Sequence, residues 1–132
     1  MPMEARDPVG ELTIRTLAMP ADANPGGNFF GGWVLSQMEM AAGLCAGQRA
    51  QGRIALVAIQ AMNFLKPVHI GDVLCVYTSI QREGRTSVAV ALEAWVLRNR
   101  FCEMVKVTEG IFTLVALDED GRSTRLPSQV AR

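Results

Sequence analysis

The sequence predicts an α+β domain in which a strongly curved five-stranded antiparallel sheet wraps around one long central helix. Two observations carry this prediction. A single proline-free segment of helix-forming residues occupies positions 33–49, and it is apolar on nearly every side. Segments of alternating apolar residues come once before it and four times after it, joined mostly by short turns. Short turns favour antiparallel neighbours, and one helix with one sheet makes an α+β domain.

Bulk composition narrows the class of protein. With 132 residues, 49% of them hydrophobic and 20% charged, the chain predicts one globular domain over 1–132, with a core at about 11–120 and polar termini. Thirteen basic residues balance thirteen acidic ones, so neither nucleic acid nor a membrane surface is indicated as a partner. The chain shows no signal segment and no apolar run long enough to span a bilayer, which predicts a cytoplasmic protein.

The three cysteines, Cys45, Cys75 and Cys102, stand without paired spacing. An odd count with no C-x-x-C spacing predicts neither a disulfide framework nor a zinc site. Because all three have apolar neighbours, we expect small buried side chains at these positions.

The elements before the sheet are predicted in order. Residues 11–19 alternate and predict the first strand, and residues 20–32 form a loop rich in proline and glycine. The helix is expected from Trp33 to Arg49, with Gly52 as its stop. Because it is apolar on nearly every side, it should be wrapped by other structure.

Four further strands are predicted at 53–67, 72–81, 87–97 and 103–117, with a hairpin turn at 83–85. In the first of these, alternation places Ile54, Leu56, Ala58 and Met62 on one face, and Val57, Ile59 and Leu65 on the other. The polar tail from Asp118 is expected to be loose. One helix covers only one sheet face, so the apolar residues of the other face predict a homo-oligomer.

Four segments together resemble a known family. They are "LAMPADANPGGNFFGGWVLSQMEMAAG", "MNFLKPVHIGDVL", "GRTSVAVALEAWV" and "VTEGIFTLVALDEDGRS". Over roughly residues 12–125 the chain is similar to the YciA-like acyl-CoA thioesterases, which have the hotdog fold. The resemblance implies hydrolysis of acyl-CoA to a carboxylate and coenzyme A, without a metal or redox cofactor. It also implies a side-by-side homodimer with active sites at its seam, commonly assembled as a trimer of dimers, which is a hexamer.

The resemblance also implies catalytic residues. Glu39 stands where the family has its catalytic acid, which is more often aspartate. Gly31 stands where related thioesterases use a backbone N–H as oxyanion donor. Asn28 occupies the place of a functional asparagine, although many YciA-like members have aspartate there. Asn24 matches an asparagine that other hotdog thioesterases place seven residues before the oxyanion glycine.

The start of the helix and Glu39 also indicate a reaction site from their chemistry alone. A helix start offers unsatisfied N–H groups, and glycines there let a ligand carbonyl approach the backbone, although they also suit a plain flexible turn. Glu39 has the small residues Ser36, Ala42 and Gly43 on its side of the helix, and burial there would raise the pKa of its carboxyl. A helix acid that reaches solvent or an ion pair is the alternative. As a catalyst, Glu39 could activate water or attack the thioester directly; both stay open.

A second group of residues suits substrate binding. The turn at 84–87 has groups that suit the phosphates of coenzyme A. Gly84 lets a ligand approach the backbone closely, Arg85 supplies a cation, and Thr86 and Ser87 supply hydroxyls. The alternative is an ordinary polar hairpin. Gly32, Asn63 and Phe64 are further candidates, the last two along the pantetheine channel. His69 is expected in a surface turn, and Trp33 and Trp95 are expected to pack.

A different function class remains open. Hotdog domains also serve as non-catalytic acyl-CoA-binding modules, and this is the alternative to an acyl-CoA thioesterase. A hydratase or dehydratase is disfavoured because the loop and helix contain no histidine. The glycine-rich segment lacks the G-K-[ST] ending of a phosphate-binding loop.

Overall fold

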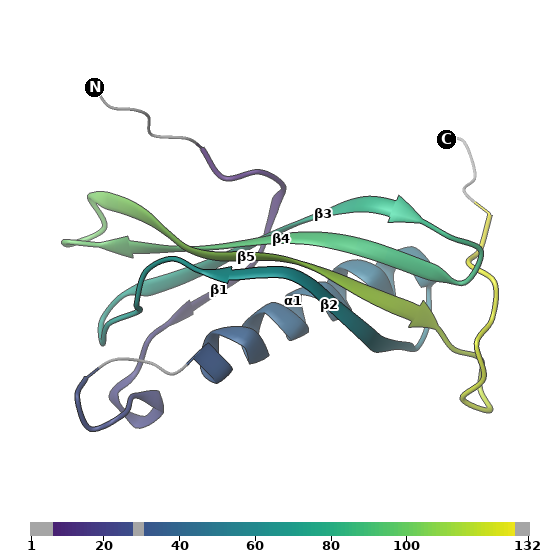
Figure 1. The fold of residues 1–132 in the computed structure, drawn as a ribbon, viewed down its shortest axis with the longest axis horizontal. Coiled ribbons are helices and arrows are strands. Elements are labelled where there is room, and N and C mark those ends of the chain that lie inside the picture. The colour runs from purple at the N-terminus through teal and green to yellow at the C-terminus, as the bar shows by residue number, and fades with distance from the viewer. Residues whose placement is uncertain (1–6, 28–30, 129–132) are drawn as a thin grey trace.

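The computed structural model describes residues 7–27 and 31–128, which form one sheet and one long helix. The elements are β1 (Glu11–Leu17), η1 (Pro20–Asp22), α1 (Gly31–Ala50), β2 (Ile54–Phe64), β3 (Val73–Glu83), β4 (Ser87–Arg98) and β5 (Glu103–Ala116). The sheet has the order β1-β3-β4-β5-β2, and all neighbours are antiparallel. Figure 1 shows the sheet curving over α1, which confirms the predicted fold class. No helix in the described ranges is long and apolar enough to cross a membrane.

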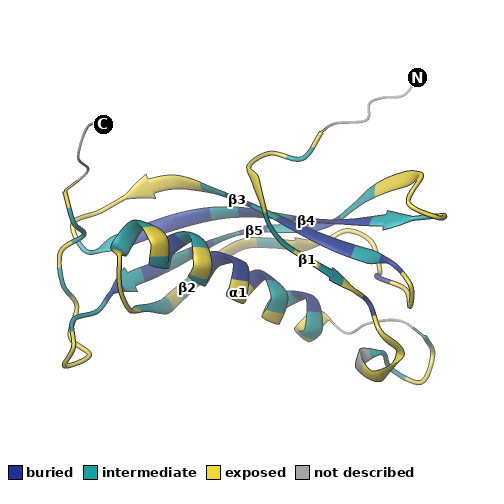
Figure 2. Cartoon of the chain, turned by 180° about the vertical axis from the view of Figure 1, so that it is seen from behind, coloured by how far each residue is buried: buried dark blue, intermediate teal, exposed yellow. Residues whose placement is uncertain are grey.

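The core lies between α1 and the concave face of the sheet. The buried residues of α1 are Val34, Met38, Ala41, Ala42 and Ala46. Three of these five are alanines, so the helix axis can lie close to the strands. The middle strands β3, β4 and β5 hold most of the buried sheet residues, whereas the β1 and β2 edges are more exposed (Figure 2). An exposed edge strand leaves backbone N–H and C=O groups without sheet partners.

The helix starts and stops at slightly different residues from those predicted. It begins at Gly31, two residues before Trp33, and ends at Ala50. Gln51 takes a left-handed backbone conformation, with φ of 54°, and its N–H donates to the carbonyl of Gly47 at 2.8 Å. The residue that ends the helix is therefore Gln51 and not the adjacent glycine at position 52.

Irregularities in β2 change which of its side chains face the helix. Leu56 pairs with Leu114 and Ile59 pairs with Phe112, with a register shift between the two pairs. Leu114 and Phe112 both belong to the core, so Leu56 and Ile59 lie on the same face. The predicted placement of Ile59 on the opposite face is wrong, because an inserted residue reverses the alternation.

The segment after β5 is attached to the protein, so the prediction of a loose tail is wrong for its described part. The N–H of Leu126 donates to the carbonyl of Arg85 at 2.9 Å, and Arg49 Nη1 donates to the carbonyl of Pro127 at 2.8 Å. Leu126 also packs against the core. Hydrogen bonds and the packed Leu126 side chain together fix the path of this polar segment.

Two expectations about individual side chains have different outcomes. Trp95 is 7% exposed and its indole N–H donates to Glu93 at 2.9 Å, as expected of a packing residue. Of the cysteines, Cys75 is buried and Cys45 is half-buried, but Cys102 is exposed in the turn between β4 and β5. The expectation of burial is therefore wrong for Cys102.

Candidate active site

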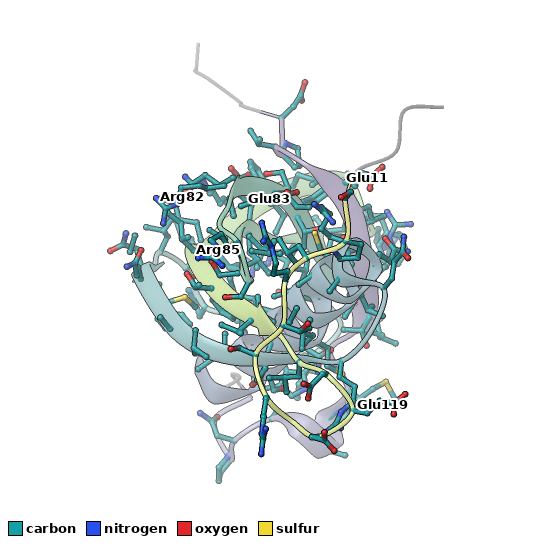
Figure 3. The ribbon with its side chains drawn as sticks, turned by 90° about the vertical axis from the view of Figure 1, so that its right-hand side faces the viewer. Glu11, Arg82, Glu83, Arg85 and Glu119 are labelled. Carbon is teal, nitrogen blue, oxygen red and sulfur yellow. The ribbon has the colours of Figure 1, made fainter. Side chains whose placement is uncertain are left out.

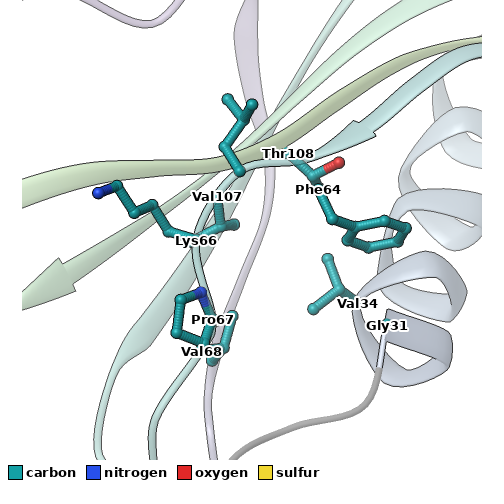
Figure 4. Close-up of a pocket in the computed structure, with 9 residues that line it drawn as sticks. Gly31, Val34, Phe64, Lys66, Pro67, Val68, Val107 and Thr108 are labelled. Atoms are coloured by element: carbon teal, nitrogen blue, oxygen red, sulfur yellow. The ribbon is translucent and has the colours of Figure 1, made fainter.

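A cavity of about 410 Å³ opens beside the first turn of α1 (Figure 4). It is lined by Gly31, Val34, Phe64, Leu65, Lys66, Pro67, Val68, Val107 and Thr108. The first N–H groups of a helix have no acceptor within the helix, and they carry the positive end of its dipole. This cavity therefore combines apolar walls with backbone donors at one end.

Gly31 and Phe64 meet at the floor of this cavity. A Cβ added at position 31 would lie 3.1 Å from the Phe64 ring, so any side chain there would push the ring aside. Phe64 itself is placed by the end of β2, where the buried hydroxyl of Thr108 donates to the carbonyl of Asn63. The sequence predictions for Gly31 and Phe64 thus fall in one place.

An ion pair fixes the opposite wall of the cavity. Arg98 Nη2 donates to Asp72 Oδ2 at 2.7 Å and to the carbonyl of Pro67 at 2.9 Å. Asp72 is 4% exposed and also accepts the N–H of His69 at 2.9 Å. Its hydrogen bond raises the pKa of Arg98, which keeps the guanidinium charged. His69 is exposed in this turn, as expected.

Glu39 does not lie in this cavity, and it is exposed on the single chain. Of the two alternatives that the sequence left open, the single chain has the helix acid that reaches solvent. The neighbours Ala42 and Gly43 are buried and half-buried, so Glu39 borders the packed side of α1 and faces outward. Met40 and Leu44, 52% and 55% exposed, occupy the same outward side. The carboxylate is available to a ligand or a second protein chain.

The loop before α1 is described only in part. Asn24 Oδ1 accepts the N–H of Gly26 at 3.0 Å, and the Asn24 carbonyl accepts the N–H of Gly27 at 3.0 Å. This is a side-chain-stabilised turn, typical of asparagine. Asn28 lies outside the described residues. Gly32 is exposed, and a Cβ added there would meet no described residue within 4 Å apart from its own turn of the helix.

The hairpin residues predicted to bind phosphates lie at the other end of the molecule. The turn at 84–87 is beside the end of α1, where Arg49 and Glu83 form an ion pair at 2.8 Å. In Figure 1 this hairpin is on the right and the start of α1 is on the left. Figure 3 looks onto the hairpin end and shows Arg82, Glu83 and Arg85 gathered there. One protomer does not bring Gly84, Arg85, Thr86 and Ser87 to the cavity beside Gly31.

Asn63 is separated from that cavity as well. It lines a smaller cavity of about 270 Å³ together with Glu93 and Glu109. Adjacent residues of a strand point to opposite faces, so Phe64 and Asn63 cannot both line one channel on the same face.

Sequence reasoning missed Lys66, Pro67, Val68 and Thr108 as lining residues of the cavity beside Gly31. One signal was visible: Lys66 is a lone cation in the apolar stretch "NFLKPV".

A curved antiparallel sheet of order β1-β3-β4-β5-β2 around one central helix defines the hotdog class of proteins. The thioesterase superfamily matches residues 26–103. The acyl-CoA thioester hydrolase YciA of Salmonella typhimurium is 43% identical over 125 residues, covering 92% of this chain and 94% of that protein. This chain therefore belongs to the thioesterase superfamily.

Solved structures support the same assignment. The crystal structure of HI0827, a hexameric broad-specificity acyl-coenzyme A thioesterase, superposes with a TM-score of 0.89 at 42% identity and covers 94% of this chain and 86% of its own. The hexameric thioesterase y2039 from Yersinia pestis superposes with a TM-score of 0.88 at 44% identity, covering 92% and 99%. An uncharacterized acyl-CoA thioester hydrolase of Haemophilus influenzae is 42% identical over 131 residues, with 94% and 82% covered.

Proposed function

We propose that this protein hydrolyses acyl-CoA thioesters to a free carboxylate and coenzyme A. The observation that carries the proposal is the apolar cavity that ends on the first turn of α1, at Gly31. Such a cavity accepts an acyl or pantetheine chain, and a helix N–H at its end can stabilise the oxyanion that forms when the thioester carbonyl is attacked. Membership of the thioesterase superfamily and the names of the relatives support this reaction.

Each residue has a proposed role. Glu39 activates the attacking water or attacks the carbonyl itself, the N–H of Gly31 holds the oxyanion, and Asn28 and Asn24 position the thioester or the water. Hydrolysis by a carboxylate and a backbone donor involves no electron transfer and no Lewis acid, so we propose that the reaction needs no metal or redox cofactor. We also place the protein in the cytoplasm.

The spacing of Gly31 and Glu39 favours a site shared between two protomers. Eight residues of continuous helix separate them by about 12 Å along the axis. The donor and the attacking group must both come within roughly 3 Å of one carbonyl group. A glutamate side chain leans toward the helix start, which shortens the separation without closing it. We therefore propose that Gly31 of one protomer and Glu39 of another serve the same thioester.

The exposed apolar surface suggests how two protomers meet. β2 is a sheet edge of 11 residues, and Val57 and Ile59 on it are 58% and 39% exposed. Together with Met40 and Leu44 on α1, they form a surface that a second copy would cover. We propose a homodimer in which two β2 edges adjoin, assembled further as a trimer of dimers. The hexameric state of the structural relatives supports the larger assembly.

The test is thiol release from a panel of acyl-CoA substrates by wild type and Glu39→Gln. Glutamine keeps the size of the side chain and removes its basicity, so turnover should fall by about 10²- to 10⁴-fold. Coenzyme A binding, followed by calorimetry, should stay within a few-fold of wild type.

The control replaces an acid far from the site, Glu119→Gln, and should leave turnover unchanged; Glu119 is exposed in the turn after β5. Near-normal turnover by Glu39→Gln would contradict the catalytic role. Binding of coenzyme A without thiol release by the wild type, on every substrate, would favour the non-catalytic binding module instead.

A further inference from the structure

Lys66 is the charged residue at the mouth of the cavity beside Gly31. The nine described residues that line the cavity include no acid and no second cation. The side chain of Lys66 points away from Phe64 and from α1 (Figure 4), and the residue is exposed. Within the described part of the chain, Lys66 has no ion-pair partner. Its unpaired charge therefore lies at the rim of the cavity, where it is available to an anionic group that stays outside the apolar part.

The backbone that carries Lys66 is held on both sides. The N–H groups of Leu65 and Lys66 donate to the carbonyl of Val107 at 2.7 and 3.3 Å. Arg98 donates to the carbonyl of Pro67 at 2.9 Å, and the proline ring fixes its own φ angle. A lysine whose backbone is already held in place loses less conformational entropy on binding a ligand than a lysine on a mobile loop.

Three other cations of the described residues, Arg98, Arg49 and Lys106, form ion pairs. Arg98 is paired with Asp72, and Arg49 is paired with Glu83 at the far end of the helix. Lys106 is bound to Glu109 at 2.5 Å. Exposed arginines such as Arg82 and Arg85 are unpaired as well, but Lys66 is the one cation among the described residues that line the cavity beside Gly31.

We propose that Lys66 binds the phosphate groups of coenzyme A at the mouth of the cavity. The proposal rests on the proposed function, because it assumes that the acyl-pantetheine part of the substrate occupies the apolar cavity. Coenzyme A joins an uncharged pantetheine arm to a strongly anionic phosphorylated nucleotide, so an apolar cavity with one cation at its mouth matches this distribution of charge. A lysine acts as a flexible point charge for phosphate.

The experiment compares one acyl group on two carriers, coenzyme A and pantetheine, which has no nucleotide phosphates. Lys66→Met keeps the length of the side chain and removes its charge. It should raise KM for acyl-CoA about five- to tenfold, as expected for an exposed charge-assisted contact, and leave kcat within about twofold. KM for acyl-pantetheine should not change. Lys66→Arg should keep KM for acyl-CoA close to the wild-type value. Added salt should raise KM for acyl-CoA more in the wild type than in Lys66→Met.

The matched control is Lys106→Met, which removes a paired lysine. Lys106 pairs across the sheet with Trp95, whose neighbours Ala94 and Val96 face the core, so it lies on the face that points away from α1. This variant should leave both KM values unchanged.

Three results would overturn the proposal. An equal rise of KM for both carriers would mean that Lys66 only shapes the cavity. A change confined to acyl groups with a free carboxylate, tested with succinyl-CoA against butyryl-CoA, would assign Lys66 to the acyl end. No change with any substrate would remove Lys66 from binding. If the wild type hydrolyses neither carrier, the proposed function fails, and calorimetric titration of coenzyme A into wild type and Lys66→Met still tests the phosphate contact.

Discussion

At the scale of single residues, Glu39 and Gly31 show what burial in one chain can and cannot establish. Gly31 is explained within the protomer, because a side chain there would meet the Phe64 ring at 3.1 Å. Glu39 is exposed on the protomer, so burial among the described residues neither opposes nor requires its charge. The sequence identified both residues through a resemblance, and only Gly31 also has a structural reason within the chain. A carboxylate that is functional at a subunit seam leaves no sign in the packing of its own subunit.

The cysteines allow a prediction at the same scale. Burial raises the pKa of the Cys45 thiol, and the nearby Glu11 carboxylate acts in the same direction, although Thr78 partly offsets them. A raised pKa means less thiolate at a given pH, and the thiolate is the reactive form. Iodoacetamide at pH 8 should therefore modify the exposed Cys102 first, then Cys45, and the buried Cys75 last. Peptide mass spectrometry over time measures this order, and the Cys45 rate should keep rising as the pH is increased above 8.

Modification of Cys45 before Cys102 would contradict the environment described for both thiols. Cys102→Ser serves as the control, since it should remove the fast phase and leave the rate at Cys45 unchanged.

At the scale of elements, prediction from the sequence succeeded where one pattern dominates. The helix and the five strands were found within a few residues of their ends, because the helix is an unbroken run of helix-forming residues and the strands are long apolar segments bounded by turns. The sequence could not show which side chains of β2 pack on α1. The register shift between Leu56 and Ala58 has no signature in the sequence, because the residues before and after it are equally apolar. The position of the 84–87 turn relative to Gly31 also depends on strand order. Sequence shows that β3 and β4 form a hairpin but not which end of the helix the hairpin turn adjoins.

The Asp72–Arg98 pair is the element-scale feature with the clearest energetic consequence. The two side chains are 5% and 21% exposed, so their interaction is only partly screened by water. Arg98→Met would leave the Asp72 carboxylate buried without its cation and should lower the free energy of unfolding by about 2 to 3 kcal/mol. It would also release the carbonyl of Pro67, and so loosen the wall of the cavity. Urea unfolding measures the first effect, and KM for acyl-CoA at a temperature where the variant is folded measures the second.

The double variant Asp72→Asn/Arg98→Met provides the comparison. Because it removes the buried charge together with its partner, it should be more stable than Arg98→Met alone. Additive losses in the double variant would show that the two side chains contribute independently.

At the scale of the whole molecule, the separation of functional residues argues for assembly. The cavity beside Gly31 and the 84–87 hairpin lie at opposite ends of α1, and Glu39 lies between them on its exposed side. A two-fold axis that joins the β2 edges would set the start of one helix against the end of the other, because paired antiparallel edges run in opposite directions. Groups that are far apart in one chain then become neighbours. The same arrangement would also cover the exposed side chains of Val57 and Ile59 on the β2 edge.

Subunit complementation tests this shared site directly. Glu39→Gln removes the acid, and Gly31→Val crowds the proposed oxyanion donor with a side chain that meets the Phe64 ring, so each variant alone should lose most of its activity. In a mixed dimer, the intact Gly31 of the first variant meets the intact Glu39 of the second, and one of the two sites is restored. Random mixing makes half of the dimers mixed, so about a quarter of wild-type activity should return. Light scattering verifies that subunits have exchanged and that the active species is not a monomer. If both residues served a site within one protomer, no mixture would contain an intact site, and activity would stay at the level of the single variants after full exchange.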